Sequence, residues 1–303
     1  MHITDPEVLK FIADTEAAYP AEANGATAKE NRRMYDAMCA VFRAPRPEGL
    51  PVRDEEVGGV PVRRYTPEGA EARPFLIYSH GGGFVVGGLD SHDDVCAELA
   101  VATGCEVVSV DYRLAPEHLF PAQIDDVAAV WTAESGGGRR GIAIGDSAGG
   151  NLSAGLCFRM RRTGGVMPLA QVLIYPGLGG DMDAASYIEN AEAPLLRTQD
   201  LKTYAGMLTG GDMELRRSNP EVSPLAAQSF AGLPPAFIVT ADVDPLRDDG
   251  PAYQKALQTA GIPTDWRNEP QLIHGYLRAR HCSTRASESF GAVCEWINAF
   301  LTA

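Results

Sequence analysis

The sequence lacks several features that would each point to a particular class of protein. None of its six cysteines belongs to a CxxC pair and their spacing is irregular, so neither a zinc cluster nor a dithiol redox site is indicated. No apolar run approaches the ~18 residues of a membrane-spanning helix, and the first residues are acidic where a secretory signal would be basic. We therefore expect a cytoplasmic protein with no membrane partner.

Basic charge is also scarce. The 26 Lys and Arg residues are outnumbered by 40 Asp and Glu residues, which gives a formal net charge of −14 at pH 7. The arginines that occur in pairs are isolated along the chain and form no basic stripe. Because an acidic surface repels a phosphate backbone, we expect no nucleic-acid partner.

The remaining composition is that of an ordinary globular protein. Hydrophobic residues make up 45% of the chain and charged residues 22%, and Gly and Pro are spread along it without a repeat. A chain of 303 residues can bury a sizeable core. This length fits one large α/β domain, alone or with an insertion, better than two equal domains.

Segments with strand and helix patterns alternate along the chain from residue 60 onward. Such alternation implies right-handed crossovers and a mostly parallel sheet covered on both faces, which is a doubly wound α/β core. The expected strands are 60–69 as an edge strand, 73–79, 105–112, 141–144, 170–176, 236–241 and 264–267. The expected helices are 5–19, 28–42, 91–102, 122–134, the segment after Ser147, 196–208 and two near the C-terminus.

One interval, from about residue 179 to 223, breaks the alternation and is too long for a simple connection between a helix and a strand. We interpret it as an insertion that forms a cap over the sheet together with the two N-terminal helices. The expected domain organisation is N-terminal cap helices at 1–45, a first part of the core at 46–182, a cap insertion at 183–215 and a second part of the core at 216–303.

Two glycine-rich segments follow predicted strands, where an open parallel sheet binds its ligands. Residues 80–83 read HGGG, which is either a flexible turn or a loop whose bare backbone N–H groups donate to an oxyanion. Residues 145–149 read GDSAG between a predicted strand and a predicted helix. That segment is either a tight turn, as around a phosphate, or a strained turn that holds Ser147 out as a nucleophile.

A serine nucleophile needs a base, and in this strand, turn and helix arrangement the acid and then the histidine follow the serine. Only His274 and His281 lie beyond Ser147 in the chain. His274 stands in a loop after a predicted strand with a glycine beside it, whereas His281 leads into the final helix and resembles a surface residue. We therefore expect His274 to be the base.

Four aspartates follow the predicted strand 236–241, namely Asp242, Asp244, Asp248 and Asp249. A divalent cation site is one interpretation, but Pro245 and Leu246 interrupt the alternation of ligands that a metal loop shows. Asp248 and Asp249 look like capping residues of the next helix. Asp244, beside the proline that ends the strand, is therefore the expected acid, and we expect no metal.

Together these motifs resemble the hormone-sensitive-lipase family of α/β-hydrolases, also called bacterial family IV esterases, and within it the GDSAG type. Five motifs occur in the family's order: HGGG, DYRLAPEHLFPA at 111–122, GDSAGG at 145–150, DPLRD at 244–248 and HG at 274–275. The likeness runs from about residue 60 to the C-terminus. The cap segments follow the family pattern only loosely, and YLRARHCS stands after His274 where aromatic residues more often continue the motif.

The resemblance implies an α/β-hydrolase fold with a helical cap and a catalytic triad of Ser147, Asp244 and His274. It also implies an oxyanion hole formed by the N–H groups of Gly82, Gly83 and Ala148, with Gly81 as an alternative donor in the glycine triplet.

Other residues of these motifs are expected to be structural rather than reactive. His80 would orient the glycine loop. Arg113, Glu117 and His118 would brace the turn beneath the site. The side chains near Tyr187, Leu195 and Tyr204 line the substrate pocket in one interpretation and belong to the core of the cap in the other.

The expected function is a serine carboxylesterase that hydrolyses short- to medium-chain carboxylic esters through an acyl-enzyme, with no metal or organic cofactor. Its partner is a small-molecule ester, and a homodimer is left open. An amidase or lactone hydrolase with the same triad is the alternative enzyme. A non-catalytic ligand-binding receptor on the same fold is the alternative outside enzymes, because a fold alone does not prove activity.

Overall fold

The computed structural model describes residues 3–19 and 27–302 and contains a mixed sheet of eight strands in the order β1-β2-β4-β3-β5-β6-β7-β8. β1 pairs with β2 and β2 with β4 in antiparallel fashion, and all other pairs are parallel. The strands are β1 (Val52–Val57), β2 (Val60–Tyr65), β3 (Phe75–Ser79), β4 (Val107–Val110), β5 (Gly141–Asp146), β6 (Gln171–Ile174), β7 (Ala236–Val243) and β8 (Thr264–Ile273).

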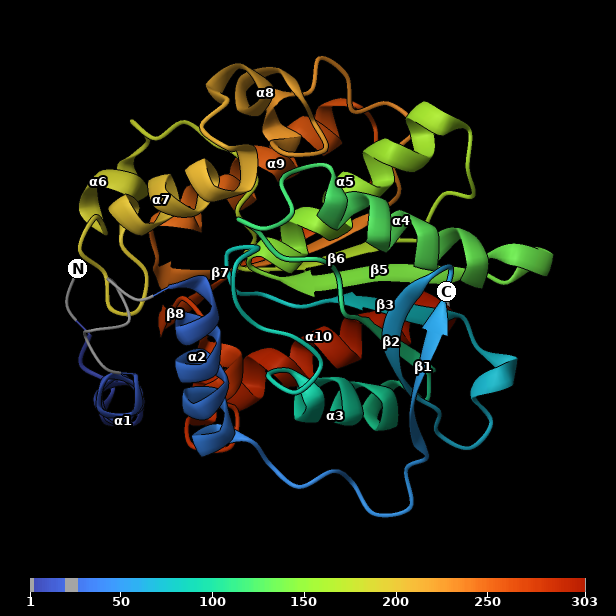
Figure 1. Ribbon diagram of the computed structural model, residues 1–303, viewed down its shortest axis with the longest axis horizontal. Coiled ribbons are helices and arrows are strands. Elements are labelled where there is room, and N and C mark those ends of the chain that lie inside the picture. Colours follow the sequence, from blue (N-terminus) through green and yellow to red (C-terminus); the bar gives the residue numbers. More distant parts are fainter. Residues whose placement is uncertain (1–2, 20–26, 303) are drawn as a thin grey trace.

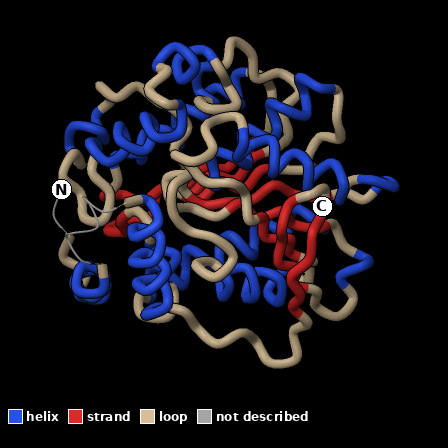
Figure 2. Tube along the Cα trace, viewed as in Figure 1, coloured by secondary structure: helices blue, strands red, loops and turns tan. Residues whose placement is uncertain are grey.

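Helices cover both faces of this sheet (Figures 1 and 2). The α-helices are α1 (Pro6–Ala18), α2 (Ala28–Phe42), α3 (Asp93–Thr103), α4 (Ala122–Glu134), α5 (Ala148–Thr163), α6 (Ala185–Glu189), α7 (Thr198–Thr209), α8 (Met213–Ser218), α9 (Asp249–Thr259) and α10 (Thr284–Thr302). Short 3₁₀ helices include η5 (Pro245–Asp248) and η6 (Tyr276–Ala279). The predicted doubly wound α/β fold is confirmed.

The central strand β3 shows how the sequence produces the layers. All five of its residues are buried, and their side chains alternate between the two faces. Phe75 and Ile77 pack in one apolar cluster with residues of α4 and α5, whereas Leu76 and Tyr78 pack in another with residues of α3 and α10. Burial of each such side chain contributes roughly 1.5–3 kcal/mol, so a continuous apolar strand specifies a helix layer on both sides.

The prediction for the first strand of the sheet was wrong in one respect. Residues 60–65 form β2, which is not an edge strand because β1 pairs with it along its outer side. β1 reads VRDEEV and is exposed along much of its length, so it carries no apolar pattern that would indicate a strand. β8 also extends six residues beyond the predicted end at 267, to Ile273.

The N-terminal helix α2 and the helices between β6 and β7 lie near the carboxyl ends of the parallel strands. Figure 1 shows α2, α6 and α7 on the side to which the arrow of β5 points. α6, α7 and α8 all lie between β6 and β7, in the interval expected to form an insertion. The Arg32 side chain fixes α2 there, since it donates to the carbonyl oxygens of Val85 and Ala115 and pairs with Glu117.

Two remaining observations concern the whole described chain. No helix in residues 3–19 and 27–302 is both long and apolar enough to cross a membrane. All six cysteines are free thiols, of which five are buried and only Cys282 is exposed.

Candidate active site

Ser147 occupies a strained turn between β5 and α5. Its backbone has φ 55° and ψ −119°, a left-handed region that a serine rarely adopts, and its N–H donates to the Ile174 carbonyl at 2.8 Å. Gly145 and Gly149, two residues before and two residues after Ser147, allow the turn to lie close against strand β3. A Cβ at Gly145 or at Gly149 would overlap the carbonyl oxygen of Ser79 in the adjacent strand β3.

The structure brings the three predicted triad residues together. His274 Nε2 lies 2.8 Å from Ser147 Oγ, and His274 Nδ1 lies 2.7 Å from Asp244 Oδ2. Because an ionised carboxylate only accepts hydrogen bonds, Asp244 selects the tautomer with hydrogen on Nδ1 and leaves Nε2 free to accept from the serine. Asp244 is fully buried, and the His274 side chain is 12% exposed.

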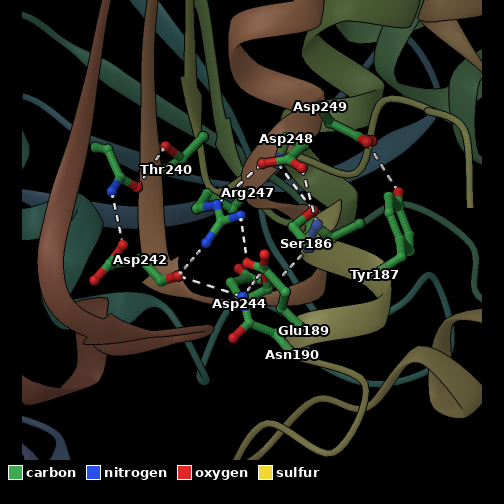
Figure 3. A network of polar contacts seen from close by, with 12 residues as sticks. Ser186, Tyr187, Glu189, Asn190, Thr240, Asp242, Asp244, Arg247, Asp248 and Asp249 are labelled. Carbon is green, nitrogen blue, oxygen red and sulfur yellow. Dashed lines mark hydrogen bonds and ion pairs between the residues drawn. The ribbon is translucent and has the colours of Figure 1, made fainter. Parts of the chain in front are cut away.

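Polar contacts hold the loop after β7 that carries Asp244 (Figure 3). The second carboxylate oxygen of Asp244 accepts the Leu246 N–H at 2.9 Å, so the carboxylate cannot rotate away from His274 without losing a hydrogen bond. The Asn190 amide donates to the Asp244 carbonyl at 3.2 Å. Ser186 Oγ donates to the Pro245 carbonyl at 2.6 Å. The acid is therefore held by residues on and beside α6.

The other three aspartates of this loop face separate partners. Asp242 accepts from the Asn268 amide at 3.0 Å. The carboxylate of Asp248 accepts the Ser186 N–H at 2.9 Å. That of Asp249 accepts the Leu178 N–H at 2.7 Å. No group of three or more potential metal ligands occurs within the described residues.

The prediction that Asp248 and Asp249 cap the following helix was wrong. Asp248 is the residue before α9, but its side chain makes no capping hydrogen bond, and Asp249 is the first residue of the helix. Both side chains instead hold the segment around 178–187, because Asp249 also accepts from the Tyr187 hydroxyl at 2.9 Å. Burial raises the pKa of Asp249 to about 6, although these hydrogen bonds favour the ionised form.

The glycine triplet lies against the serine turn. The Gly81 N–H donates to Asp146 Oδ1 at 3.0 Å, so it is not free to donate to a substrate. Among the described residues no hydrogen bond uses the N–H of Gly82, Gly83 or Ala148. Gly82 has φ 124°, and a Cβ there would overlap the carbonyl oxygen of Val86, so only glycine fits this position.

Asp146, the residue before the serine, ties the two loops together. Its carboxylate accepts from the Tyr78 hydroxyl at 2.8 Å and from the Gly81 N–H, and it lies 3.3 Å from His92 Nε2. Burial alone would raise the pKa of this carboxyl, but the neighbouring His92 and the hydrogen bonds from His92 and Tyr78 together hold it below its usual range. A buried anion thus anchors the glycine triplet.

His80 is fully buried beside the glycine triplet. Its ring stacks on Tyr112 with 4.2 Å between centroids, and its Nδ1 lies 2.8 Å from the Gly81 carbonyl oxygen. Burial, with a smaller contribution from His92, lowers the pKa of His80 to about 3. A neutral imidazole that donates to the loop carbonyl is therefore the form present near neutral pH.

The other predicted structural residues lie apart from the serine. Arg113 forms an ion pair with Asp126 at 2.7 Å, and Glu117 pairs with Arg32. The His118 carbonyl accepts from the Gln123 amide at 2.6 Å. His281, the rejected candidate for the base, pairs with Glu98 at 2.7 Å.

A cavity of about 160 Å³ opens above Ser147 and His274. The glycine loop forms one side of it, and helices α2 and α7 with the loop before α7 form much of the rest. Its wall includes Gly82, Gly83, Phe84, Ala148, Tyr175, Tyr187, Leu195, Leu196, Tyr204, Leu208 and Leu246. The three side chains expected near the pocket, Tyr187, Leu195 and Tyr204, are all part of this wall.

Sequence reasoning missed several polar residues of the cavity wall, and three of them come from separate helices. Tyr35 comes from α2, Arg216 from α8 and Arg278 from η6. The first and the last of them, Tyr35 and Arg278, are 243 positions apart in the chain, and no spacing rule connects the three. The only signal was local, since Arg278 stands four residues after His274 within YLRARHCS.

Known proteins are similar to this chain in sequence over most of its length. A family model described as the α/β hydrolase fold matches residues 76–278. Carboxylesterase NlhH of Mycobacterium tuberculosis is 40% identical, covering 95% of this chain and 93% of that protein. Ethyl acetate hydrolase of Pseudomonas putida is 31% identical, covering 96% and 97%.

A solved structure has a similar fold. The crystal structure of an esterase from the bacterial hormone-sensitive lipase family superimposes with a TM-score of 0.88 at 27% identity, covering 99% of this chain and all of that one. Both the sequence and the fold are thus similar to those of carboxylic ester hydrolases over nearly their whole length. The chain belongs to the hormone-sensitive-lipase family of α/β hydrolases.

Proposed function

We propose that the protein is a carboxylesterase that hydrolyses short- to medium-chain carboxylic esters with Ser147 as nucleophile, His274 as base and Asp244 as acid. The observation that carries this proposal is the continuous hydrogen-bonded chain from Ser147 Oγ through His274 to Asp244 at 2.8 and 2.7 Å. The relatives support it, since the named ones are a carboxylesterase and an ethyl acetate hydrolase.

The reaction follows from this geometry. Ser147 Oγ attacks the ester carbonyl carbon while His274 Nε2 takes its proton, and Asp244 stabilises the resulting imidazolium. The C–O bond to the alcohol then breaks, and the imidazolium returns the proton to the leaving alkoxide. Water, activated by the same histidine, attacks the acyl-serine and releases the carboxylic acid.

The negative charge of both tetrahedral intermediates falls on the former carbonyl oxygen. We assign its stabilisation to the N–H groups of Gly82, Gly83 and Ala148, which have no other acceptor among the described residues. Ala148 is the first residue of helix α5, and the helix dipole favours an anion at this end. The Gly81 N–H is committed to Asp146 and is not assigned to the hole.

The wall of the cavity supports a preference for short and medium acyl chains. Tyr204 from α7 approaches the glycine loop so closely that a Cβ at Gly83 would lie 2.6 Å from its ring. The acyl group and the alcohol group of the substrate share this one cavity. We assign the helices α1, α2 and α6 to α8 to a cap that limits the length of the substrate.

Replacement of the nucleophile tests the proposal. Ser147→Ala is expected to lower kcat for p-nitrophenyl acetate by at least about 10⁴-fold, because the acyl-enzyme cannot form. Circular dichroism and melting curves would show whether the variant is folded. Hydrolysis at the parental rate by folded Ser147→Ala protein would refute the assignment, and a matched amide would show whether amides are cleaved as well.

A further inference from the structure

The polar part of the cavity wall carries positive charge that the triad does not explain. Arg278 lies on η6, directly after the loop that carries His274, and its side chain is half-buried. Its Nη2 lies so close to the backbone of Gly275 that a Cβ there would be 2.8 Å away. The guanidinium is thus next to the base but is not hydrogen-bonded to it.

No carboxylate within the described residues forms an ion pair with Arg278. Its Nη1 donates to the Tyr35 hydroxyl at 3.3 Å, its guanidinium carbon lies 5.8 Å from the centre of the Tyr35 ring, and its buried Nε has no hydrogen-bond partner. Arg280, two residues further on, is also buried but pairs with Asp94 at 2.6 Å and with Glu98 at 2.8 Å. Arg278 therefore differs from its nearest arginine in forming no ion pair with a carboxylate.

None of the titratable neighbours of Arg278 forms an ion pair with it. Burial raises the pKa of the Tyr35 and Tyr175 hydroxyls and raises that of the Cys39 thiol to about 11, so all three are uncharged near neutral pH. Asp146 is the one acidic residue of the cavity wall. Its negative charge acts on Arg278, but the two form no ion pair, and the Asp146 carboxylate accepts from Tyr78, Gly81 and Tyr175 and contacts His92.

A second arginine on the same wall is also without a carboxylate. Arg216 of α8 is half-buried, and its one hydrogen bond within the described chain is to Met182 Sδ at 3.8 Å. An acidic protein with a net charge of −14 thus places two unpaired guanidinium groups on the cavity that contains its serine. A half-buried cation without a counter-ion is costly unless a ligand supplies the negative charge.

We propose that the preferred substrate is an ester that also carries a carboxylate, and that Arg278, assisted by Arg216, binds this carboxylate while Ser147 attacks the ester. This inference rests on the proposed function. A guanidinium binds a carboxylate through two parallel hydrogen bonds, which gives a directed interaction that an apolar pocket cannot supply. Half-esters of dicarboxylic acids carry the charge on the acyl side, and esters of hydroxy acids carry it on the alcohol side.

Pairs of esters in which a free carboxylate is replaced by its ethyl ester test the proposal, with rates expressed per ester bond hydrolysed. Monoethyl glutarate and diethyl glutarate compare the acyl side, and 4-acetoxybutyrate and its ethyl ester compare the alcohol side. We expect a higher kcat/KM for the anionic member of one pair, mainly through a lower KM. A higher kcat/KM for the neutral member of both pairs would overturn the proposal and leave the esterase assignment intact.

Variants connect the preference to the arginines. Arg278→Gln is expected to lower the ratio of anionic to neutral kcat/KM by about 10- to 100-fold, the range for one charge-assisted pair, and Arg278→Lys is expected to restore part of it. A purely structural role, in which Arg278 supports Tyr35 and α2, would instead lower both rates together. The control is Arg217→Gln, which removes an exposed arginine beside Arg216 and should leave the ratio unchanged.

A binding measurement separates this inference from the proposed function. Calorimetry with Ser147→Ala protein and monoethyl glutarate or 4-acetoxybutyrate reports anion binding without turnover. Binding that weakens at least about 10-fold in Ser147→Ala/Arg278→Gln would support the carboxylate site even if no ester were hydrolysed. Equal affinity of the two proteins for both anions would refute it, whatever the esterase activity is.

Discussion

At the scale of single residues, the site depends on conformations that few side chains can adopt. Ser147 and Gly82 both have positive φ, at 55° and 124°. The glycine satisfies this requirement without strain, whereas the serine is held there by the crossing of β5 and α5. The sequence indicated the two motifs because glycines cluster where a backbone must approach another closely.

Gly82→Ala is expected to remove activity with little loss of secondary structure. Its Cβ would overlap the Val86 carbonyl oxygen and displace the proposed oxyanion donors. Loss of one such donor costs about 100- to 1000-fold in rate, or roughly 3 to 4 kcal/mol. The measurement is kcat for p-nitrophenyl acetate beside a melting curve, and retention of more than about a tenth of the parental kcat would contradict the role of this loop.

Asp249 is expected to make stability fall as the pH rises. Its pKa in the folded protein is about 6, above the usual aspartate value of 3.8, so the folded state binds a proton more tightly than the unfolded state. The stability it contributes is complete below pH 3.8 and is lost as the pH rises through 6. The slope in this window is at most about 1.4 kcal/mol per pH unit.

Comparison with Asp249→Asn isolates this effect. His80 changes the stability in the opposite direction. Its pKa is lowered from 6.5 to about 3 in the folded protein, so the stability that it contributes is lost as the pH falls below 6.5. Denaturant unfolding of both proteins from pH 4 to 7 should show a difference in free energy of unfolding that shifts in favour of the asparagine variant as the pH rises. A constant difference over this range would show that Asp249 does not titrate in it.

At the scale of secondary-structure elements, the sequence predicted what a local apolar pattern determines. α2 and α4 lie at the predicted residues, and β3, β4, β6 and β7 lie at predicted runs. β1 was missed because it is polar and is a strand only through its pairing with β2. The triad residues could be nominated because each follows a strand, but the cavity wall could not, since it joins helices that meet only in three dimensions.

The crossing of α5 with β3 provides a test of close packing. Gly149→Ala is expected to be destabilising because its Cβ would overlap the Ser79 carbonyl oxygen, although alanine is the better helix former. Gly206→Ala in α7 is the matched control, because no atom lies within 4 Å of the added Cβ, and it should stabilise by about 0.5–1 kcal/mol. Melting temperatures that rise in both variants would show that the crossing tolerates a side chain.

At the scale of the whole molecule, the cavity is a joint product of segments distant in sequence. Tyr35 lies on α2, Tyr204 lies on α7 and Tyr175 comes directly after β6, so we expect the length of the substrate to depend on how these parts meet. The domain boundaries, the cytoplasmic location and the homodimer stay predictions. Substrate size is the property of the assembled molecule that can be measured most directly.

A series of p-nitrophenyl esters from acetate to palmitate measures the substrate size that the cavity accepts. We expect kcat/KM to be highest for short acyl chains, because side chains of α7 and of the loop before it form the cavity wall near the serine. Replacement of Tyr204 by alanine should move the maximum to longer chains by removing a ring from the wall. A maximum at twelve or more carbons in the parent protein, about the length of a lipid chain, would contradict the proposed cap.

The distribution of thiols gives the folded molecule a chemical signature. Five of the six cysteines are buried and Cys282 alone is exposed. A thiol reagent that cannot enter the interior should therefore titrate one group per native chain and six per unfolded chain. The rate at which the other five become reactive would report the opening of the two helix layers, and a dye attached at Cys282 would mark the chain without any substitution.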